Sequence, residues 1–187
     1  MIANEMFLDT ALMRDSIISH AKELNYLPRS FRSAVATVNI TLENNSDDAT
    51  ILIPRCTTFT ATSGNKNFTF SLPENVQAVS TNVPNRYFAE NVQIAEGNYT
   101  SDSYVTNDLN PPRFLITNKT VDTGSIRVTV IEDNGAETFS YVQRDSLFDI
   151  GSTDQVFFLQ AAENDSYEVI FGDNVIGRKP KIIRSFL

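Results

Sequence analysis

The chain has 187 residues, of which 41% are hydrophobic, a content typical of folded globular proteins that excludes overall disorder. Its formal net charge of −8 argues against nucleic-acid binding, which needs a concentrated basic face. No apolar run approaches the roughly 18 residues that span a bilayer, and the N-terminus has no secretory pattern. We therefore expect a soluble protein of intracellular origin, with neither nucleic acid nor membrane as a partner.

Residues 4–24, NEMFLDTALMRDSIISHAKEL, are predicted to form the one long helix. At about 100° per residue its apolar side chains share one arc, and polar side chains gather on the opposite side. A helix of this length is marginal alone in water, so we expect most of its stability to come from tertiary or quaternary contacts. Its position at the end of a β domain suggests that it joins subunits. The residues predicted for this subunit interface are Phe7, Leu8, Ala11, Arg14, Ile18 and Ala21.

Arg14 is the exception in this arc, because it is charged and lies between Ala11 and Ile18 on the wheel. An unpaired buried charge costs several kcal/mol. Arg14 therefore either extends along its methylenes to water or pairs with another chain at a helix-bundle seam. The sequence does not choose between these two interpretations.

Asn25 and Pro28 end the helix and begin an extended linker. From residue 34 onward the hydrophobic period changes to two, which is typical of half-buried strands. Residues 73–84 have valines between turn residues and could form a short helix or an irregular segment. The predicted strands are 34–42, 49–53, 57–62, 67–72, 87–94, 103–106, 114–116, 125–131, 138–143, 155–161 and 167–171.

These strands predict a mainly β fold with an N-terminal helix, namely an antiparallel β-sandwich or irregular barrel plus a long assembly helix. Asn134-Gly135 is the strongest hairpin signal in the chain. We expect an N-terminal assembly helix and linker at 1–27, a β-rich domain at 28–178, and a tail at 179–187 that is disordered or an artificial chain end.

The sequence offers little for catalysis, so we expect no enzyme, no metal site and no cofactor. His20 is the only histidine and falls on the polar face of the predicted helix, where an exposed structural side chain is expected. Cys56 is the only cysteine, which excludes an intrachain disulfide and a zinc site built on several thiolates. It lies in a turn between two predicted strands, where a packing role is favoured over that of a nucleophile.

Several segments, in this order, resemble the baseplate J family of contractile-tail phage proteins, above all the baseplate wedge proteins of T-even-type phages. The family's helix with an Arg-Ser/Asp stretch and Asn/Gly-Tyr-x-Pro linker is matched by Arg14-Asp15-Ser16 and Asn25-Tyr26-Leu27-Pro28. Its Ile-Pro-x-Gly-Thr-x-Phe motif is matched by Ile53-Pro54-Arg55-Cys56-Thr57-Thr58-Phe59. Its Phe-Gly-Asp/Glu-Gly motif is matched by Phe171-Gly172-Asp173-Asn174.

The resemblance implies a virion structural protein in the tail baseplate, which assembles with copies of itself and with other wedge proteins. It also implies that the N-terminal helix joins a bundle with partner helices. Members of the family are longer, so the chain would be a fragment or a short member. The alternative that we keep open is a carbohydrate- or receptor-binding β-sandwich of a phage tail, suggested by polar loops and by Tyr87, Tyr99 and Tyr104.

Two positions depart from the family's motifs. Cys56 stands where the family has glycine, so a turn that needs positive φ would be strained or changed in type. Asn174 replaces the second glycine of the last motif, but asparagine tolerates the left-handed conformation. We therefore expect a strained or altered turn at Cys56, whereas Asn174 can keep the conformation that glycine would have.

Overall fold

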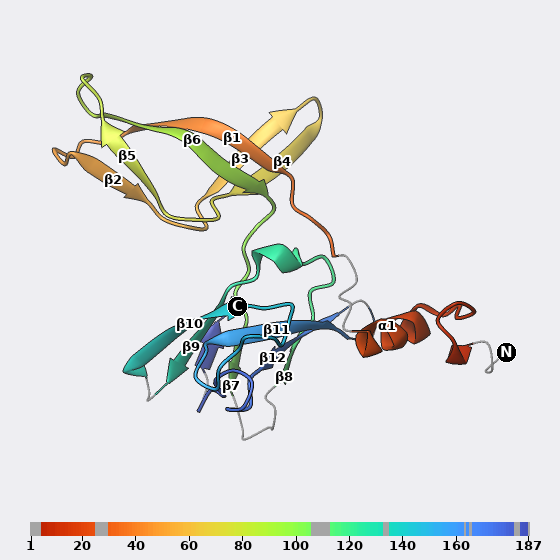
Figure 1. Cartoon of the computed structure of the whole chain (residues 1–187). Helices are drawn as coiled ribbons and strands as arrows, with labels where there is room; N and C mark the ends of the chain where they lie inside the picture. The colour runs from red at the N-terminus through yellow and green to blue at the C-terminus, as the bar shows by residue number, and fades with distance from the viewer. Residues whose placement is uncertain are drawn as a thin grey trace. The chain divides into compact units, whose positions relative to one another are not determined.

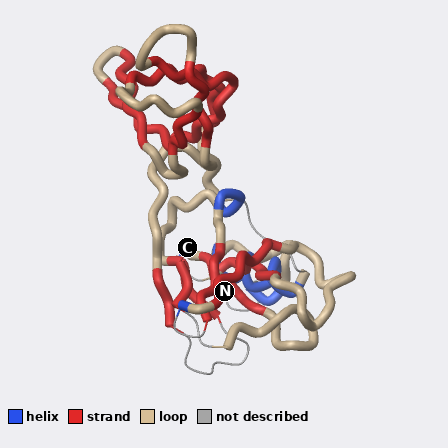
Figure 2. Tube along the Cα trace, turned by 90° about the vertical axis from the view of Figure 1, so that its left-hand side faces the viewer, coloured by secondary structure: helices blue, strands red, loops and turns tan. Residues whose placement is uncertain are grey.

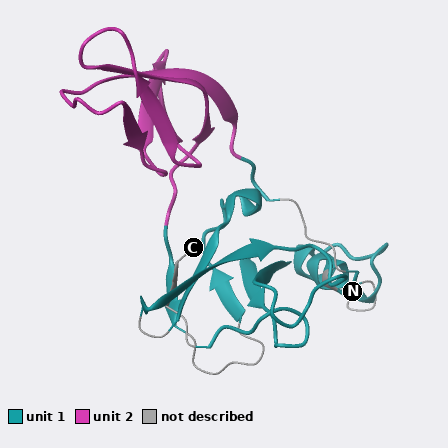
Figure 3. Cartoon of the chain, turned by 60° about the vertical axis from the view of Figure 1, so that its left-hand side comes forward, with its two compact units in different colours: residues 1–32, 101–187 teal, residues 33–100 magenta. Residues whose placement is uncertain are grey.

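The chain folds into two compact units (Figure 3). Unit 1 combines Met1–Arg32 with Ser101–Leu187, and unit 2 is Ser33–Thr100. Unit 2 is therefore inserted into unit 1, and these boundaries differ from those expected after residues 27 and 178. The computed structural model describes residues 5–24, 30–105, 113–132, 135–162, 164, 166–181 and 184–186.

Unit 2 is built around one long strand, β6 (Figure 1). Along one edge β6 pairs with β1, and on its other edge it pairs with β5 near its start and with β4 near its end, all antiparallel. β2 then pairs with β5, and β3 with β4. The strands are β1 (Val35–Glu43), β2 (Thr50–Ile53), β3 (Thr58–Ser63), β4 (Lys66–Ser71), β5 (Val76–Ser80) and β6 (Arg86–Glu96).

A β-bulge bends β6 at Asn91, which has a left-handed φ of 54°. Val38 pairs with Val92 and Ile40 pairs with Ala89, so β6 has one residue more than β1 between these pairs. Asn91 N–H donates to a side-chain oxygen of β1 at 3.0 Å. The bend lets both edges of β6 carry strands over one core, whose buried residues are Ile40, Ile53, Leu72, Ala78, Tyr87, Ala89, Val92 and Ile94.

Unit 1 contains the second sheet, in the order β7-β13-β9-β10-β11-β12-β8. Its pairs are antiparallel except β10 and β11, which run parallel and are joined by the crossover 144–155. The strands are β7 (Ser103–Val105), β8 (Arg113–Ile116), β9 (Val128–Glu132), β10 (Glu137–Gln143), β11 (Val156–Ala161), β12 (Tyr167–Phe171) and β13 (Arg184–Phe186), with the 3-10 turn η2 (Thr123–Ser125).

This sheet curls so that its two edge strands meet. The hydroxyl of Tyr104 on β7 donates to the carbonyl of Leu115 on β8 at 2.7 Å, and its ring lies 5.3 Å from that of Phe114. Phe171 adds edge-to-face contacts with Phe114 and Tyr141. The core therefore lies inside a half-barrel, and its remaining buried residues are Ile116, Val128, Val130, Phe157, Tyr167 and Val169.

The predicted mainly β fold is confirmed, and strands dominate both units (Figure 2). The hairpin predicted from Asn134-Gly135 is also confirmed, since β9 and β10 pair antiparallel around it. The long helix predicted for 4–24 is wrong in its first half, because α1 covers only Arg14–Glu23. Residues 76–80 form a strand where a short helix or irregular segment was expected.

Candidate functional site

The N-terminal residues before α1 fold back onto it through Glu5. The Glu5 carboxylate accepts the N–H of Leu12 at 3.2 Å and that of Met13 at 3.1 Å, and the Glu5 carbonyl lies 2.9 Å from Nε2 of His20. A side-chain hydrogen bond from Ser16, followed by the Leu12 N–H, holds the pKa of Glu5 below its ordinary value. The carboxylate thus satisfies free donors at the helix start, which explains why residues 5–13 do not continue the helix.

Two of the six predicted interface residues are buried by this chain itself. Ile18 is 6% exposed and Ala21 is 7% exposed. Helix α1 lies beside β11. Ile18 and Ala21 are the buried residues among those of α1 whose burial the structure describes. Their side chains are therefore covered within this chain, and their role in a subunit interface stays a prediction.

The other four predicted interface residues lie at or before the start of α1. Phe7 is 62% exposed and Leu8 is exposed, whereas Ala11 is half-buried. Arg14 is the exposed first residue of α1, and its charge lies close enough to Tyr167 to offset part of the rise that burial causes in the pKa of that phenol. Whether these residues bind another subunit stays a prediction.

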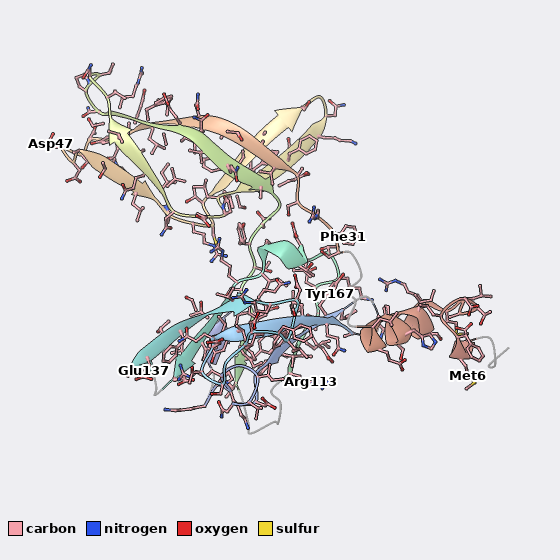
Figure 4. The ribbon with its side chains drawn as sticks, in the orientation of Figure 1. Met6, Phe31, Asp47, Arg113, Glu137 and Tyr167 are labelled. Atoms are coloured by element: carbon pink, nitrogen blue, oxygen red, sulfur yellow. The ribbon has the colours of Figure 1, made fainter. Side chains whose placement is uncertain are left out.

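Sequence reasoning identified only Phe7 and Leu8 among the exposed apolar side chains of this segment, which together we call the N-terminal apolar surface. A helical wheel does not apply before residue 14, and Asp15 in the first turn is the signal that could have placed the helix start there. Figure 4 labels Met6, which lies beyond the start of α1 near the N-terminal end of the described chain. The N-terminal apolar surface consists of Met6, Phe7, Leu8, Leu12, Met13 and Ile17, all exposed.

The segment after β12 forms a tight loop in which two backbones touch. A Cβ on Gly172 would lie 2.3 Å from the carbonyl carbon of Gly177 and 2.5 Å from the carbonyl oxygen of Ile176. Gly177 itself has a left-handed φ of 79°. Only glycine at position 172 permits this approach, which gives the Phe-Gly-Asp-Asn motif a structural meaning.

Asp173 and Asn174 close this loop with their side chains. Oδ1 of Asp173 accepts the N–H groups of Ile176 and Val175, both at 2.9 Å, and these bonds hold the pKa of Asp173 below its ordinary value. Oδ1 of Asn174 accepts the N–H of Lys179 at 2.8 Å. The φ of Asn174 is 71°, a left-handed conformation that asparagine tolerates better than most residues.

The loop after β12 is joined to the crossover between β10 and β11. Gly177 N–H donates to the carbonyl of Gly151 at 3.1 Å, and Arg178 N–H donates to the carbonyl of Asp154 at 2.8 Å. These bonds connect two stretches that are distant in sequence. We call them the loop pair, which consists of residues 144–155 and 172–178.

A buried ion pair fixes the end of the loop pair to the sheet. Nη2 of Arg178 lies 2.6 Å from Oε2 of Glu132, which is fully buried, and Oε1 of Glu132 accepts the N–H of Lys181 at 3.2 Å. The guanidinium also lies 3.9 Å from the ring centre of Phe139. Burial raises the pKa of the neighbouring Tyr141 to about 12. We interpret this polar cluster as structural, because the charges of Arg178 and Glu132 pair with each other.

The turn in unit 2 that contains Cys56 keeps a positive φ, which is the strained one of the two alternatives expected for it. Cys56 has a φ of 67°, where the family has glycine, and its N–H donates to the carbonyl of Leu72 at 2.9 Å. The hydroxyl of Thr57 donates to the carbonyl of Pro54 at 2.6 Å. The turn therefore holds a side-chain-bearing residue in a region that favours glycine.

The three tyrosines considered for sugar stacking are engaged within the chain. Tyr87 is buried, and its hydroxyl donates to the carbonyls of Ser46 at 2.6 Å and Asp48 at 3.0 Å. The hydroxyl of Tyr104 donates a hydrogen bond to the carbonyl of Leu115 on β8. The ring of Tyr99 lies under the guanidinium of Arg55, 5.1 Å from its Cζ. Each of them thus has a contact within the chain, while Tyr99 and Tyr104 stay partly exposed.

The residues considered for chemistry lie in different units. His20 belongs to unit 1 and Cys56 to unit 2. Within the described ranges, no three His, Cys, Asp or Glu side chains are grouped so that they could hold a metal ion. Across those same ranges, no helix has the length and hydropathy to cross a membrane. The expected lack of catalysis and of cofactors stays a prediction.

Comparison with known proteins supports a phage origin. No family model matches the chain. The chain is 28% identical over 176 residues to the baseplate wedge protein gp6 of Enterobacteria phage T4. The match covers 92% of this chain but 25% of the T4 protein, so the chain spans about a quarter of the length of that curated relative. The sequence is thus distantly similar, along nearly all of its length, to part of a phage baseplate wedge protein.

Proposed function

We propose that this protein is a structural component of a phage contractile-tail baseplate wedge, located in the virion tail and without catalytic activity. The similarity to the T4 wedge protein over 92% of the chain supports this role. The partners that we propose are other copies of the chain and other baseplate wedge proteins. Cofactors, nucleic acid and membranes have no part in the proposed role.

The observation that carries the proposal is the N-terminal apolar surface. Its six side chains are exposed within a short stretch, and Leu12 is 85% exposed. Scattered exposed apolar residues are ordinary, but a cluster on one segment marks an interaction site. We propose that this surface, rather than the predicted arc that includes Ile18 and Ala21, joins the subunits.

Point substitutions test this interface better than a deletion does. Ile18 and Ala21 dock α1 onto the sheet, so removing the whole segment would also damage unit 1. The variant Phe7→Ser/Leu12→Ser changes only exposed side chains. The matched control is Leu52→Ser/Val79→Ser, which changes two exposed apolar side chains in unit 2.

The chain and its variants would be co-expressed with the other wedge proteins of the same phage, and the mass of the purified complex would be measured by light scattering. We expect Phe7→Ser/Leu12→Ser to lose co-purification at least about tenfold while the control retains it. Retention by both variants would reject the N-terminal apolar surface as the interface. Failure of the wild-type chain to associate with any wedge protein would reject the wedge role itself.

A further inference from the structure

The loop pair carries a second set of exposed apolar side chains on unit 1. Leu147 and Phe148 lie on the crossover after β10, and Phe148 is 87% exposed, the largest exposed fraction among the large hydrophobic residues described. Val175 and Ile176 lie on the loop after β12 and are also exposed. Neither apolar pair contributes to the cores of the two units.

The backbone that carries these side chains is fixed before any partner binds. The backbones of Gly172 and Gly177 are in contact, and the carboxylate of Asp173 accepts the N–H groups of Val175 and Ile176. Backbone hydrogen bonds also join the two loops to each other. The Phe148 N–H donates to the hydroxyl of Ser146 at 3.2 Å. A preorganised surface loses little conformational entropy on binding, so its apolar side chains contribute more of their burial to affinity.

The exposed charged residues of the loop pair are mostly negative. Four aspartates of the loop pair are exposed, and Arg144 is its one exposed basic residue. The other arginine of the loop pair, Arg178, already faces buried Glu132. The exposed aspartates are Asp145, Asp149, Asp154 and Asp173.

This charge pattern decides between two kinds of occupant. In a two-fold contact between copies of this chain, the same patch would face itself, and aspartates would oppose aspartates. We propose that the loop pair is instead a docking surface for a different protein, whose apolar groove or face is rimmed by lysine or arginine. The proposal goes beyond the N-terminal interface and does not depend on it.

The test uses two short amphipathic peptides, one of leucine and lysine and one of leucine and glutamate, titrated against the full chain. Binding would be measured by fluorescence anisotropy, and the contacted residues by amide chemical shifts. The variant is Phe148→Ser, and the matched control is Phe31→Ser, which removes another exposed phenylalanine of unit 1. Asp145→Asn/Asp149→Asn tests the charge requirement without touching the apolar side chains.

We expect the leucine–lysine peptide to bind with shifts confined to the loop pair, and the leucine–glutamate peptide to bind at least about tenfold more weakly. Phe148→Ser and the double asparagine variant should each weaken the first peptide several-fold, whereas Phe31→Ser should leave it unchanged. Equal binding of both peptides, equal loss in Phe148→Ser and Phe31→Ser, or shifts elsewhere would overturn the proposal. Self-association of the chain that is lost only in Phe148→Ser would replace it with a contact between copies.

Discussion

The N-terminal apolar surface and the loop pair use the same local device but differ in what supports it. In each, one exposed carboxylate accepts two backbone N–H groups: Glu5 before α1 and Asp173 after β12. The loop pair adds the contact between Gly172 and Gly177 and a buried ion pair, while the N-terminal segment adds hydrogen bonds from Ser16 and His20.

This difference teaches which surface is fixed and which can adjust. Exposed carboxylate bonds contribute little to global stability, whereas backbone packing and buried charge contribute much. We infer that the loop pair is a preformed docking surface, and that the N-terminal segment can rearrange at small cost when subunits join.

The largest expected effect is that of Gly172→Ala. The new Cβ would overlap backbone atoms of Gly177, so either the loop or β12 must move, and we expect a loss of about 4 kcal/mol in the free energy of unfolding. Urea unfolding measures it. Gly151→Ala is the control in the same loop pair, because its nearest contact would be an ordinary 3.7 Å from Asp154. Equal stability of the two variants would show that the loop is not locked.

Arg178→Ala should have the next largest effect. It would leave the fully buried Glu132 carboxylate without its ion-pair partner, which we expect to cost about 3 kcal/mol. Arg86→Ala is the control, since its pair with Glu43 is exposed, and it should cost less than about 1 kcal/mol. Chemical denaturation compares the two, and similar small losses would mean that the buried pair does not anchor the loop pair.

Cys56→Gly should have a smaller effect of the opposite sign. Cys56 has the same left-handed backbone as Asn174, and glycine removes the steric cost at a loss in chain entropy. We expect a gain of about 0.5–1 kcal/mol, measured as a rise in the melting temperature. Asn174→Gly should raise the stability less, because it also removes the hydrogen bond that the Asn174 side chain accepts from the N–H of Lys179. A melting temperature lowered by Cys56→Gly would contradict this interpretation of the turn.

Glu5→Gln should have the smallest global effect and a clear local one. The pKa of Glu5 is lowered in the folded chain, so its bonds stabilise the segment above the ordinary value of 4.5 and are lost as pH falls through the lower folded pKa. We expect faster hydrogen exchange at the Leu12 and Met13 amides in the variant, with an unchanged urea midpoint. Exchange at β12 amides serves as the control. A large shift of the urea midpoint in Glu5→Gln would mean that the N-terminal segment contributes to global stability as much as the loop pair does.

The period-two alternation predicted most strands because it reports burial on one face of a sheet. It failed at β5, where the fully buried residue is the small Ala78 and the larger Val79 is exposed, so the valine spacing resembled a helix. It also failed before Arg14, because Glu5 caps the helix from a distance that no local pattern encodes. The insertion of unit 2 was not predictable either, since β7 is held in unit 1 by β13, far along the chain.

The candidate site was predictable only in part. The family motifs marked Cys56 and Asn174 as positions where the family has glycine, and both have a positive φ, but the motifs did not say whether the turn at Cys56 would be strained or changed in type. The wheel placed Ile18 and Ala21 in the interface, but a pattern of apolar residues does not say which neighbour covers them. The exposure of Leu12 and Phe148 follows from chain folding that sequence periodicity does not describe.

The most direct measurement of the central claim is hydrogen exchange at the amides of residues 6–17, compared between the free chain and the chain co-assembled with the other wedge proteins of its phage. We expect assembly to slow exchange at Leu12 and Met13 at least about tenfold, because burial of the N-terminal apolar surface closes this segment. Exchange at the same rate in both states would contradict its role as the subunit interface.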